Sequence, residues 1–508
     1  MTKSRLQTMR EERLAKLRQL YELGINSYPS HSRRDHNNLY AVDNSDQLQG
    51  KTISLVGRIV SLRHHGKLAF IDIEDSTRKV QLYIKSDVLK PLNIKAQTLG
   101  FDEVKLLDLG DFVEARGEMT TTNSGQVSLM PSKIRLLTKT LRPLPTPRDL
   151  ANDPDFIFRR RYADLATNLS QRELFIRKAA FWQANREFLQ TKGFIEVEVP
   201  VLEQVTGGAD ARPFTTHMNA LDQNFFLRIS TELYQKRLIG GGFEKIYTFG
   251  PNFRNEGISD EHLPEYYQVE WYWAYADYND NMALVEEMFK YIAQKVYGKY
   301  TFTTRDHTFN LDQNWERISY PDIIKERFGV DIFKTSNEEM MKIIKQAGTK
   351  LEGAINRNRL IDNLWKLIRK DISGPAFLIN EPAFMSPLSK SRPDRPELTE
   401  RFHVIIAGSE LGNGYSELNN PIEQLDRFRD QQSQRDNGDD EAQMMDIDYV
   451  EMLEYGMPPT SGYGHSERIF WFLEDITSRQ GTLFPALKYK ISPITRTIYG
   501  LSSKKIVE

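Results

Sequence analysis

Hydrophobic positions change their spacing along the chain, and each change predicts a different kind of element. Residues 1–34 place Leu and Met at helical intervals among basic side chains, which fits either a solvated amphipathic helix or a surface for an acidic ligand. From about residue 52 to 138 the pattern becomes a short apolar–polar alternation interrupted by glycines, which predicts five strands. Five short strands in so small a stretch favour a closed barrel.

The chain after the barrel divides into a linker and a mixed domain. The proline-rich segment LRPLPTPRDLANDPD predicts a stiff linker, so we place a domain boundary near residue 148. Residues 171–192 have a helical apolar period, and residues 195–202 alternate as a strand. Several later strand-like segments have links too short for parallel pairing, which predicts a mainly antiparallel sheet covered by helices. The predicted α+β chain has two domains, residues 1–148 and residues 149–508, and the second contains a helical insertion near residues 334–371.

Composition narrows the classes of protein that this organisation allows. The 508 residues are 39% hydrophobic and 27% charged, which supports folded domains and excludes bulk disorder. The absence of cysteine excludes disulfides and thiolate metal sites, so any metal ion must sit on oxygen or imidazole ligands. A net charge of −2 neither requires nor excludes nucleic acid. No apolar stretch reaches the length of a membrane span and the charged start lacks a signal-peptide core, so we expect a cytoplasmic protein without membrane contact.

Residues 253–278 carry the first candidate chemistry of the second domain. They predict two antiparallel strands joined by a polar loop, with Arg254 and Glu256 before the loop, His262 within it and Tyr266 after it. Such a hairpin can bind a nucleoside triphosphate, because arginine neutralises phosphate and an aromatic ring stacks on the base. The alternative is a hairpin with a structural ion pair.

Acidic side chains recur in a second segment, residues 408–421. Glu410 and Glu417 are an odd number of positions apart, so an unbroken strand would point them to opposite faces. A bulge at Gly412 or Gly414 would bring them to one face. Carboxylates there can hold magnesium on a nucleotide or bind a cationic substrate. The alternative is a solvated strand edge.

Glycines precede a Glu–Arg pair in a third segment, residues 461–476. Gly462 and Gly464 let the backbone approach a ligand closely. Arg468 would stand at the start of the apolar helix that follows, although the pair also fits a helix cap.

Taken in order, these segments resemble the signature of class II aminoacyl-tRNA synthetases, and most closely those specific for lysine. The similarity runs from about residue 3 to 488. It includes the stretches GRIVSLRHHGKLAFIDIEDSTRKVQLYI, GFIEVEVPVL at motif 1, FRNEGISDEHLPEYYQVEWYWAYADY at motif 2, and GNGYSELNNP. The resemblance implies an anticodon-binding OB-type barrel and a class II catalytic domain that dimerises through motif 1. It also implies that L-lysine is activated with ATP and transferred to the 3′ end of lysine tRNA.

The resemblance further implies roles for individual residues. The expected catalytic residues are Arg254, between the α-phosphate and the amino acid's carboxylate, and Arg468, on the far side of ATP. The other implied ATP-binding residues are Glu256, His262, Tyr266 and Glu410, and Glu410 is also the implied ligand of Mg²⁺. The implied lysine-binding residues are Gly208, Glu232, Arg254, Tyr272, Asn413 and Glu417. The implied anticodon-binding residues are Arg63, Phe70 and Gln81, although Phe70 also fits the barrel core.

Charge separates a lysine pocket from an aspartate pocket of the same architecture. A substrate ammonium about 4 Å from the Glu417 carboxylate gains about 4 kcal/mol at an effective dielectric constant of about 20, whereas a substrate carboxylate is repelled. A neutral side chain would leave Glu417 unpaired. The sequence therefore predicts rejection of aspartate and asparagine.

Three positions depart from the family pattern. His403 stands where a magnesium-binding glutamate is usual, and Lys133 replaces a glutamate of the barrel. Glu467 replaces an aspartate in a third motif that is one residue shorter. Two alternatives therefore remain open. One is a paralogue that transfers lysine to a protein, against which the intact barrel argues, and the other is a catalytically silent RNA-binding descendant.

Overall fold

The chain forms two compact units in the computed structural model. The structure describes residues 4–146, 155–348, 356–436 and 442–501. The first unit comprises residues 1–167 and 488–508, and the second comprises residues 168–487. The boundary predicted near residue 148 lies outside the described residues. In the described ranges, no helix has the length and apolar character needed to cross a membrane.

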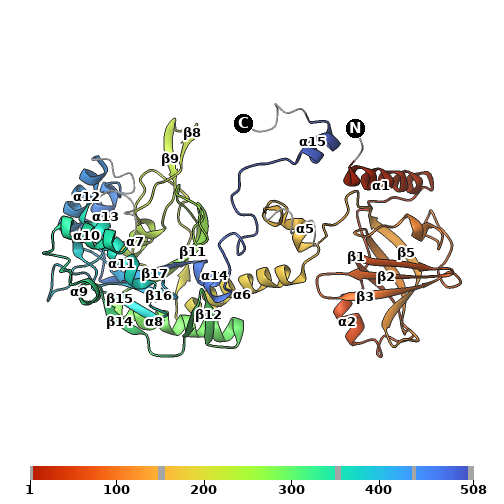
Figure 1. The fold of residues 1–508 in the computed structure, drawn as a ribbon, viewed down its shortest axis with the longest axis horizontal. Coiled ribbons are helices and arrows are strands. Elements are labelled where there is room, and N and C mark those ends of the chain that lie inside the picture. Colours follow the sequence, from red (N-terminus) through yellow and green to blue (C-terminus); the bar gives the residue numbers. More distant parts are fainter. Residues whose placement is uncertain (1–3, 147–154, 349–355, 437–441, 502–508) are drawn as a thin grey trace. The chain divides into compact units, whose positions relative to one another are not determined.

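The first unit contains a closed five-stranded barrel, as the alternating pattern predicts (Figure 1). The strands are β1 (Thr52–His65), β2 (Leu68–Glu74), β3 (Lys79–Lys85), β4 (Phe112–Thr121) and β5 (Val127–Thr138), and neighbours follow the order β1-β2-β3-β5-β4. Alternate side chains such as Ile71 and Leu82 fill the barrel core. The amphipathic helix α1 (Arg5–Glu22) buries Leu17 and Leu20. The other helices of the unit are α2 (Asn38–Asp43), η1 (Glu103–Leu106), α4 (Phe156–Arg159), α5 (Arg161–Leu165) and α15 (Pro493–Tyr499).

An eight-stranded sheet forms the centre of the second unit, in the order β14-β15-β16-β17-β18-β11-β10-β6. The two outermost pairs are parallel and the inner pairs are antiparallel, which confirms the predicted sheet type. The strands are β6 (Ile195–Glu196), β10 (Lys245–Phe253), β11 (Glu265–Ala274), β14 (Glu316–Ser319), β15 (Ala376–Ile379), β16 (Arg401–Ile406), β17 (Ser409–Ser416) and β18 (Thr460–Ser466). Smaller sheets contain β7 (Leu202–Glu203), β8 (Thr215–Met218), β9 (Gln223–Leu227), β12 (Thr301–Thr304) and β13 (His307–Asn310).

The strand predicted for residues 195–202 is not continuous, because its first two residues form β6 and Leu202 begins the separate strand β7. Strand β6 ends at Glu196. The chain after Glu196 makes one further bond to β10, from the Val197 N–H to the Tyr247 carbonyl (2.9 Å). Beyond it a side chain holds the backbone, because Arg228 Nη1 donates to the carbonyls of Val199 (3.2 Å) and Pro200 (3.4 Å). Pro200 also has no N–H with which to continue a ladder.

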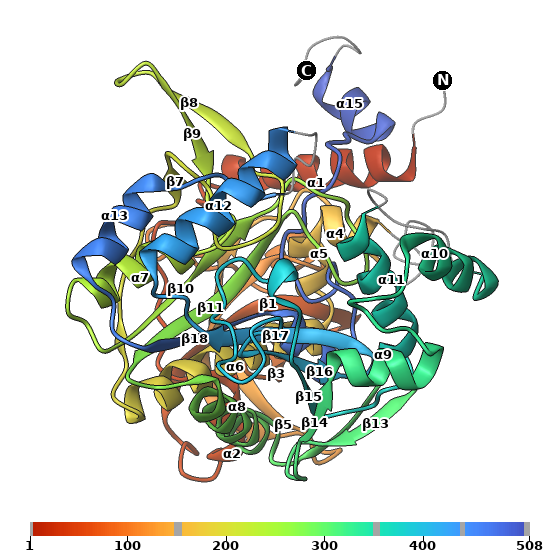
Figure 2. The same cartoon turned by 90° about the vertical axis from the view of Figure 1, so that its left-hand side faces the viewer.

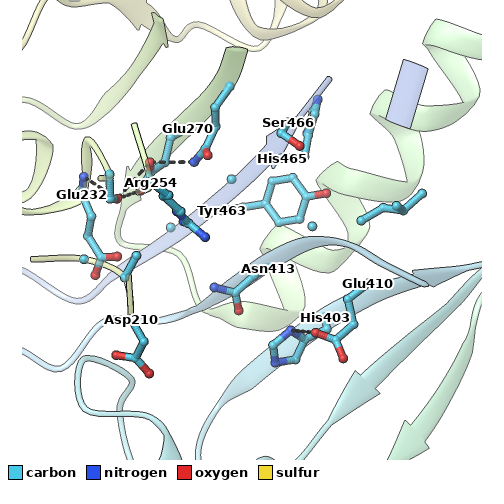
Figure 3. Close-up of a pocket in the computed structure, with 18 of the residues that line it drawn as sticks. Asp210, Glu232, Arg254, Glu270, His403, Glu410, Asn413, Tyr463, His465 and Ser466 are labelled. Atoms are coloured by element: carbon cyan, nitrogen blue, oxygen red, sulfur yellow. Dashed lines mark hydrogen bonds and ion pairs between the residues drawn. The ribbon is translucent and has the colours of Figure 1, made fainter. Parts of the chain in front are cut away.

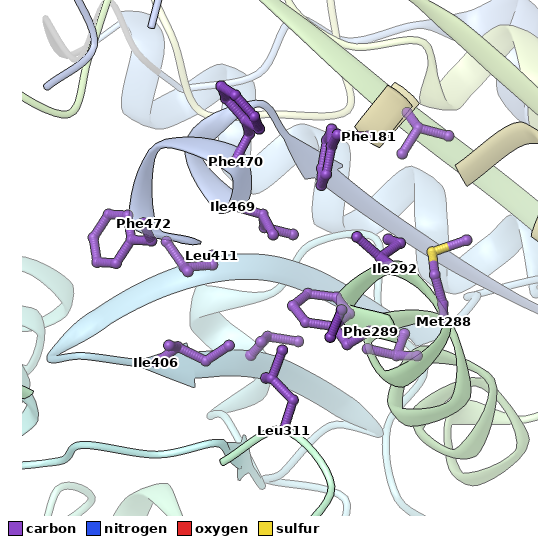
Figure 4. Close-up of a cluster of buried hydrophobic side chains, with 14 of the residues drawn as sticks. Phe181, Met288, Phe289, Ile292, Leu311, Ile406, Leu411, Ile469, Phe470 and Phe472 are labelled. Atoms are coloured by element: carbon purple, nitrogen blue, oxygen red, sulfur yellow. The ribbon is translucent and has the colours of Figure 1, made fainter. Parts of the chain in front are cut away.

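Helices and apolar side chains cover one face of the sheet. The predicted helix near residues 171–192 is present as α6 (Leu169–Thr191). Together with α8 (Tyr278–Ile292) and α14 (Arg468–Leu473) it contributes to one core cluster. Figure 4 shows how Phe181 of α6, Phe289 of α8 and Phe470 of α14 point toward this cluster. Helix α8 continues as η2 (Ala293–Tyr297).

The remaining helices form two further groups (Figure 2). In one group, α13 (Ile447–Tyr455) contacts both α7 (Glu232–Gly240) and α12 (Pro421–Asp436). In the other, α11 (Arg357–Arg369) contacts α9 (Tyr320–Phe328) and α10 (Asn337–Gln346) around a separate core. Helices α10 and α11 confirm the helical character predicted for residues 334–371 wherever the structure describes that segment. A short η3 (Ala383–Met385) follows β15.

Candidate active site

A cavity of about 390 Å³ in the second unit brings together the candidate residues of all three sequence segments. All of the predicted ATP-binding and lysine-binding residues line it: Gly208, Glu232, Arg254, Glu256, His262, Tyr266, Tyr272, Glu410, Asn413, Glu417 and Arg468. Figure 3 shows side chains from several elements pointing toward this space. The predicted residues therefore share one site, although their individual roles stay predictions.

The β10–β11 hairpin supplies one wall through simple strand alternation. Arg254 lies just after β10, which ends at Phe253, so it belongs to the loop and not to the strand. On β11, Tyr266, Glu270 and Tyr272 line the cavity because residues two apart share a face. The intervening Trp271 is completely buried in the core.

Strand β17 supplies the opposite wall through a bulge. Its pairing with β16 shifts by one residue, because Ile405 pairs with Glu410 while Val404 pairs with Gly412. Leu411 is the extra residue, and the shift brings Glu410 to the face that carries Asn413. The sequence left a bulge at Gly412 or Gly414 as a possibility, and the structure has one at the adjacent Leu411. It allows both Glu410 and Glu417, which follows the end of β17, to line the cavity.

Three buried carboxylates gather at one end of the cavity. Tyr415 Oη donates to Glu232 Oε1 over 2.5 Å, and Tyr272 Oη donates to Glu270 Oε1 over 2.7 Å. Glu417 comes from the chain just after β17, where its backbone pairs with Ser389. In the described part of the chain, no well-aligned hydrogen bond reaches either Glu417 carboxylate oxygen.

A fully buried lysine holds two of these carboxylates. Lys236 Nζ lies 2.5 Å from Glu232 Oε1 and forms an ion pair with Glu417 Oε2. Burial alone would lower the pKa of Lys236, but the Glu232 and Glu417 carboxylates outweigh it and raise that pKa. Lys236 therefore stays charged. It pairs with only one oxygen of Glu417, and the other, Oε1, has no partner among the described residues.

Burial also changes the proton affinity of the acids themselves. Burial raises the pKa of Glu417 well above its ordinary value, and repulsion from Glu232 adds to the effect while Lys236 opposes it. Burial and the charge of Glu232 likewise raise the pKa of Glu270. An added ammonium would relieve this crowding of negative charge, so the site is suited to a cationic ligand.

Cationic side chains occupy another part of the same cavity. The Nε atoms of Arg254 and Arg468 are buried without a hydrogen-bond partner among the described residues. Arg254 lies over the Tyr266 ring at 5.4 Å, and Arg468 pairs with Glu261. Burial lowers the pKa of His262 to about 4, and the positive charge of Arg468 contributes. An anionic ligand would give the two Nε–H groups the acceptors that they lack.

At two glycines the backbone packs closely against the side chains of the acidic end. Gly208 has φ of +83°, a conformation that favours glycine, and a Cβ there would lie 2.7 Å from Glu232 Cβ. A Cβ on Gly462 would lie 2.5 Å from Glu417 Oε1 and 2.4 Å from the Tyr272 ring. Either added side chain would displace a wall of the acidic end.

Glu410, the predicted magnesium ligand, is surrounded by nitrogen donors. Trp365 Nε1 donates to Glu410 Oε1 over 2.6 Å, and Arg369 Nη1 lies 3.4 Å from the same oxygen. His403 Nδ1 lies 3.5 Å from Oε2 (Figure 3). Across the residues that the structure describes, no group of three or more His, Asp or Glu side chains is arranged to hold a metal ion. These surroundings do not fit a metal ion held by the protein itself.

The changed third motif has a structural explanation. Glu467 forms an ion pair with Lys178 of α6, and its Oε1 accepts the Tyr267 N–H over 3.2 Å. It is not among the residues that line the cavity, whereas the neighbouring Arg468 is. The longer glutamate therefore joins α6 to the start of α14.

The predicted anticodon-binding residues lie on neighbouring strands of the barrel. Phe70 pairs with Arg63 across β1 and β2, and with Tyr83 across β2 and β3. The rings of Phe70 and Tyr83 stack at 5.3 Å. Ala69 and Ile71 are completely buried while Phe70 is only half-buried, so the core position considered for Phe70 is wrong. Gln81 also lies on the outer side of β3, where Ser128 Oγ donates to Gln81 Oε1 over 3.1 Å.

Sequence reasoning missed several side chains that shape the cavity. Lys236 stands four residues after Glu232 on α7, a spacing that by itself predicts only a common helical ion pair. Arg401 Nε donates to Asn413 Oδ1 over 2.9 Å and so orients that amide. Glu270 shares the alternation of Tyr266 and Tyr272, so its position two residues before Tyr272 was a usable signal.

Comparison with known proteins gives a family match for the sheet domain and another for the barrel. Residues 153–488 match the family described as tRNA synthetases class II (D, K and N), and residues 53–137 match the OB-fold nucleic acid binding domain. A lysine–tRNA ligase from Thermotoga maritima is 41% identical over 497 residues, covering 96% of this chain and 97% of that protein. The lysine–tRNA ligase of Clostridium acetobutylicum is 42% identical over 494 residues, covering 96% and 94%. That of Thermosipho africanus is 41% identical over 469 residues, covering 90% and 91%.

Proposed function

The chain belongs to the class II tRNA synthetases of the D, K and N group, and from this premise we propose that it is a lysine–tRNA ligase. It activates L-lysine with ATP to lysyl-adenylate and then transfers the lysyl group to the 3′ end of lysine tRNA. The observation that carries the choice of amino acid is the buried acidic end of the cavity, formed by Glu232, Glu270 and Glu417.

The charge balance of that end supports lysine as the substrate. Three carboxylates and the one ammonium of Lys236 leave an excess of two negative charges when all are ionised. L-lysine brings two ammonium groups, one at each end of its side-chain stem. In this proposal Glu417 receives the ε-ammonium beside Tyr272 and Asn413, and Glu232 with Gly208 receives the α-amino group. Aspartate would bring a carboxylate to a negative site and is rejected.

The first step of the proposed reaction is an in-line displacement at phosphorus. A lysine carboxylate oxygen attacks the α-phosphorus of ATP, the bond to the bridging oxygen of the β-phosphate breaks, and pyrophosphate leaves. Arg254 neutralises charge between the attacking carboxylate and the α-phosphate, using the guanidinium Nε that lacks an acceptor. Arg468 holds the far side of ATP, Glu256 and Tyr266 contact the adenine, and His262 lies near the γ-phosphate.

The second step moves the lysyl group to RNA. A terminal ribose hydroxyl of the tRNA attacks the carbonyl carbon of lysyl-adenylate, and AMP leaves with the electrons of the broken bond. The hydroxyl proton passes to the phosphate of the departing AMP. Neither step needs a covalent bond to the protein, because positioning and charge neutralisation are sufficient.

Mg²⁺ enters this proposal with ATP, as part of the substrate. Bound to the phosphates, it neutralises part of their charge. The nitrogen donors around Glu410 support this assignment over an ion held by the protein alone.

The barrel supplies the proposed contact with the anticodon of lysine tRNA. Phe70 offers a half-buried ring on which a base can stack, and Arg63 and Gln81 offer hydrogen bonds to base edges. We further propose that the chain acts in the cytoplasm as a homodimer through motif 1. Ile176 of α6 and Ile195 of β6 support the dimer, because their side chains are 65% and 57% exposed in the single chain. A sedimentation experiment should give twice the mass of one chain.

Aminoacylation of tRNA with labelled amino acids tests the proposed function. We expect acid-precipitable label from lysine in the presence of ATP, and none from aspartate or asparagine. Tight tRNA binding without any adenylate formation would contradict the proposal and favour the silent RNA-binding alternative.

A further inference from the structure

The carboxylate of Glu410 is already matched by donors from an inserted helix. Trp365 and Arg369 stand four residues apart on α11, so both reach the same side. The Trp365 N–H and the Arg369 guanidinium converge on Glu410 Oε1, at 2.6 and 3.4 Å.

The neighbouring acids are matched by cations in the same way. Glu381 Oε2 lies 3.1 Å from Arg401 Nε and 2.8 Å from His403 Nε2. Glu261 pairs with both Arg305 and Arg468. Glu381 and Glu261 therefore each have basic partners. A divalent cation instead requires several free oxygen ligands with uncompensated negative charge.

We propose that Glu410 is not a metal ligand in this chain, and that Arg369, delivered by α11, provides the positive charge that a protein-held divalent ion would otherwise provide there. The inference rests on the proposed use of ATP. It explains His403, because an imidazole between Glu381 and Glu410 takes the place of a second carboxylate that a metal site needs. The divalent ion of the reaction then stays on the phosphates of ATP and is not shared with the protein.

Counting bound Mn²⁺ tests this inference without measuring catalysis. Mn²⁺ is titrated into the free protein and into its complex with lysine and α,β-methylene ATP, and unbound Mn²⁺ is followed by electron paramagnetic resonance. We expect the wild type and Glu410→Gln to bind the same number, about one ion per nucleotide complex. The Gln side chain keeps an oxygen that can accept from Trp365, so this variant should fold.

A second pair of variants tests the role of Arg369. The double variant Arg369→Met/His403→Glu removes the competing cation and adds a carboxylate, so it should bind an additional Mn²⁺ near Glu410. Arg327→Met is the matched control, because it removes a half-exposed arginine of α9 that lies 3.9 Å from Asp371, and its count should equal the wild type.

The inference would be overturned if Glu410→Gln lost an ion that the wild type binds, or if the double variant gained none. Pyrophosphate exchange on the same wild-type sample separates this failure from failure of the proposed function. Loss of an ion in Glu410→Gln together with normal lysine-dependent exchange in the wild type would refute only the inference. Unchanged ion counts without such exchange would refute only the proposed function.

Discussion

At the residue scale, Lys236 decides how the acidic end of the cavity is used. Its side chain has no exposed surface and lies between Glu232 and Glu417. In the proposed function, the two negative charges that Lys236 leaves unbalanced match the two ammonium groups of L-lysine. The buried lysine also fixes the positions of both carboxylates, so less side-chain entropy is lost when the substrate binds.

Replacing Glu417 by Gln should remove lysine recognition selectively. The loss of a buried charge opposite the ε-ammonium should lower kcat/KM for lysine roughly 100-fold or more, while the KM for ATP stays nearly unchanged. Initial rates of pyrophosphate exchange at varied lysine and ATP measure both constants. Glu451→Gln, an exposed change on α13, is the control. Equal losses for lysine and ATP would contradict the assigned position of Glu417.

The buried carboxyl group of Glu203 should make the stability of the folded chain depend on pH. Burial raises the pKa of its carboxyl from 4.5 to about 8, although Arg228 opposes the shift, and one of its oxygens is buried without a partner in the described structure. Between these pH values the folded chain binds a proton that the unfolded chain has lost. This contribution to stability is therefore fully present below pH 4.5 and is lost as the pH rises to about 8.

Glu203→Gln should therefore be more stable than the wild type at pH 8, by an amount on the order of 1–3 kcal/mol, and the difference should shrink toward pH 5. Urea unfolding across this pH range measures the effect. The exposed Glu198→Gln is the matched control and should show no such trend. A Glu203→Gln difference that is constant with pH would contradict the raised pKa.

At the scale of elements, much of the fold was predictable because local patterns agree with it. The alternation of β2 and β3 placed Ile71 and Leu82 in the barrel core, and the helical period identified α6. The short strand β6 was not predictable, because the chain near Pro200 is held by Arg228, a residue far along the sequence. The bulge at Leu411 was only a conditional expectation, since strand pairing and not local pattern determines it.

The outer face of the barrel around Phe70 should contribute to the charging of lysine tRNA. Phe70→Ala should lower charging of lysine tRNA roughly 10-fold or more, because a stacking platform contributes about 1–3 kcal/mol per base. Lysine-dependent pyrophosphate exchange should not change, since the cavity residues belong to the second unit. Tyr40→Ala, on α2 of the same unit, is the control. If Phe70→Ala charged tRNA at the wild-type rate, the proposed contact between Phe70 and the anticodon would be contradicted.

At the scale of the whole molecule, two compact units divide the proposed work. The residues implied for ATP and lysine all line one cavity of the second unit, and those implied for the anticodon lie on the barrel of the first. The order of motifs along the sequence was enough to predict this grouping. It did not predict Arg369 or Lys236, because each acts through a partner that only tertiary packing brings near.

The most direct test of this account is ATP–pyrophosphate exchange with each proteinogenic amino acid supplied separately. The acidic cavity predicts exchange with L-lysine at least roughly 100-fold faster than with aspartate or asparagine, because those substrates leave the buried carboxylates repelled or unpaired. Exchange with aspartate or asparagine and none with lysine would contradict the account.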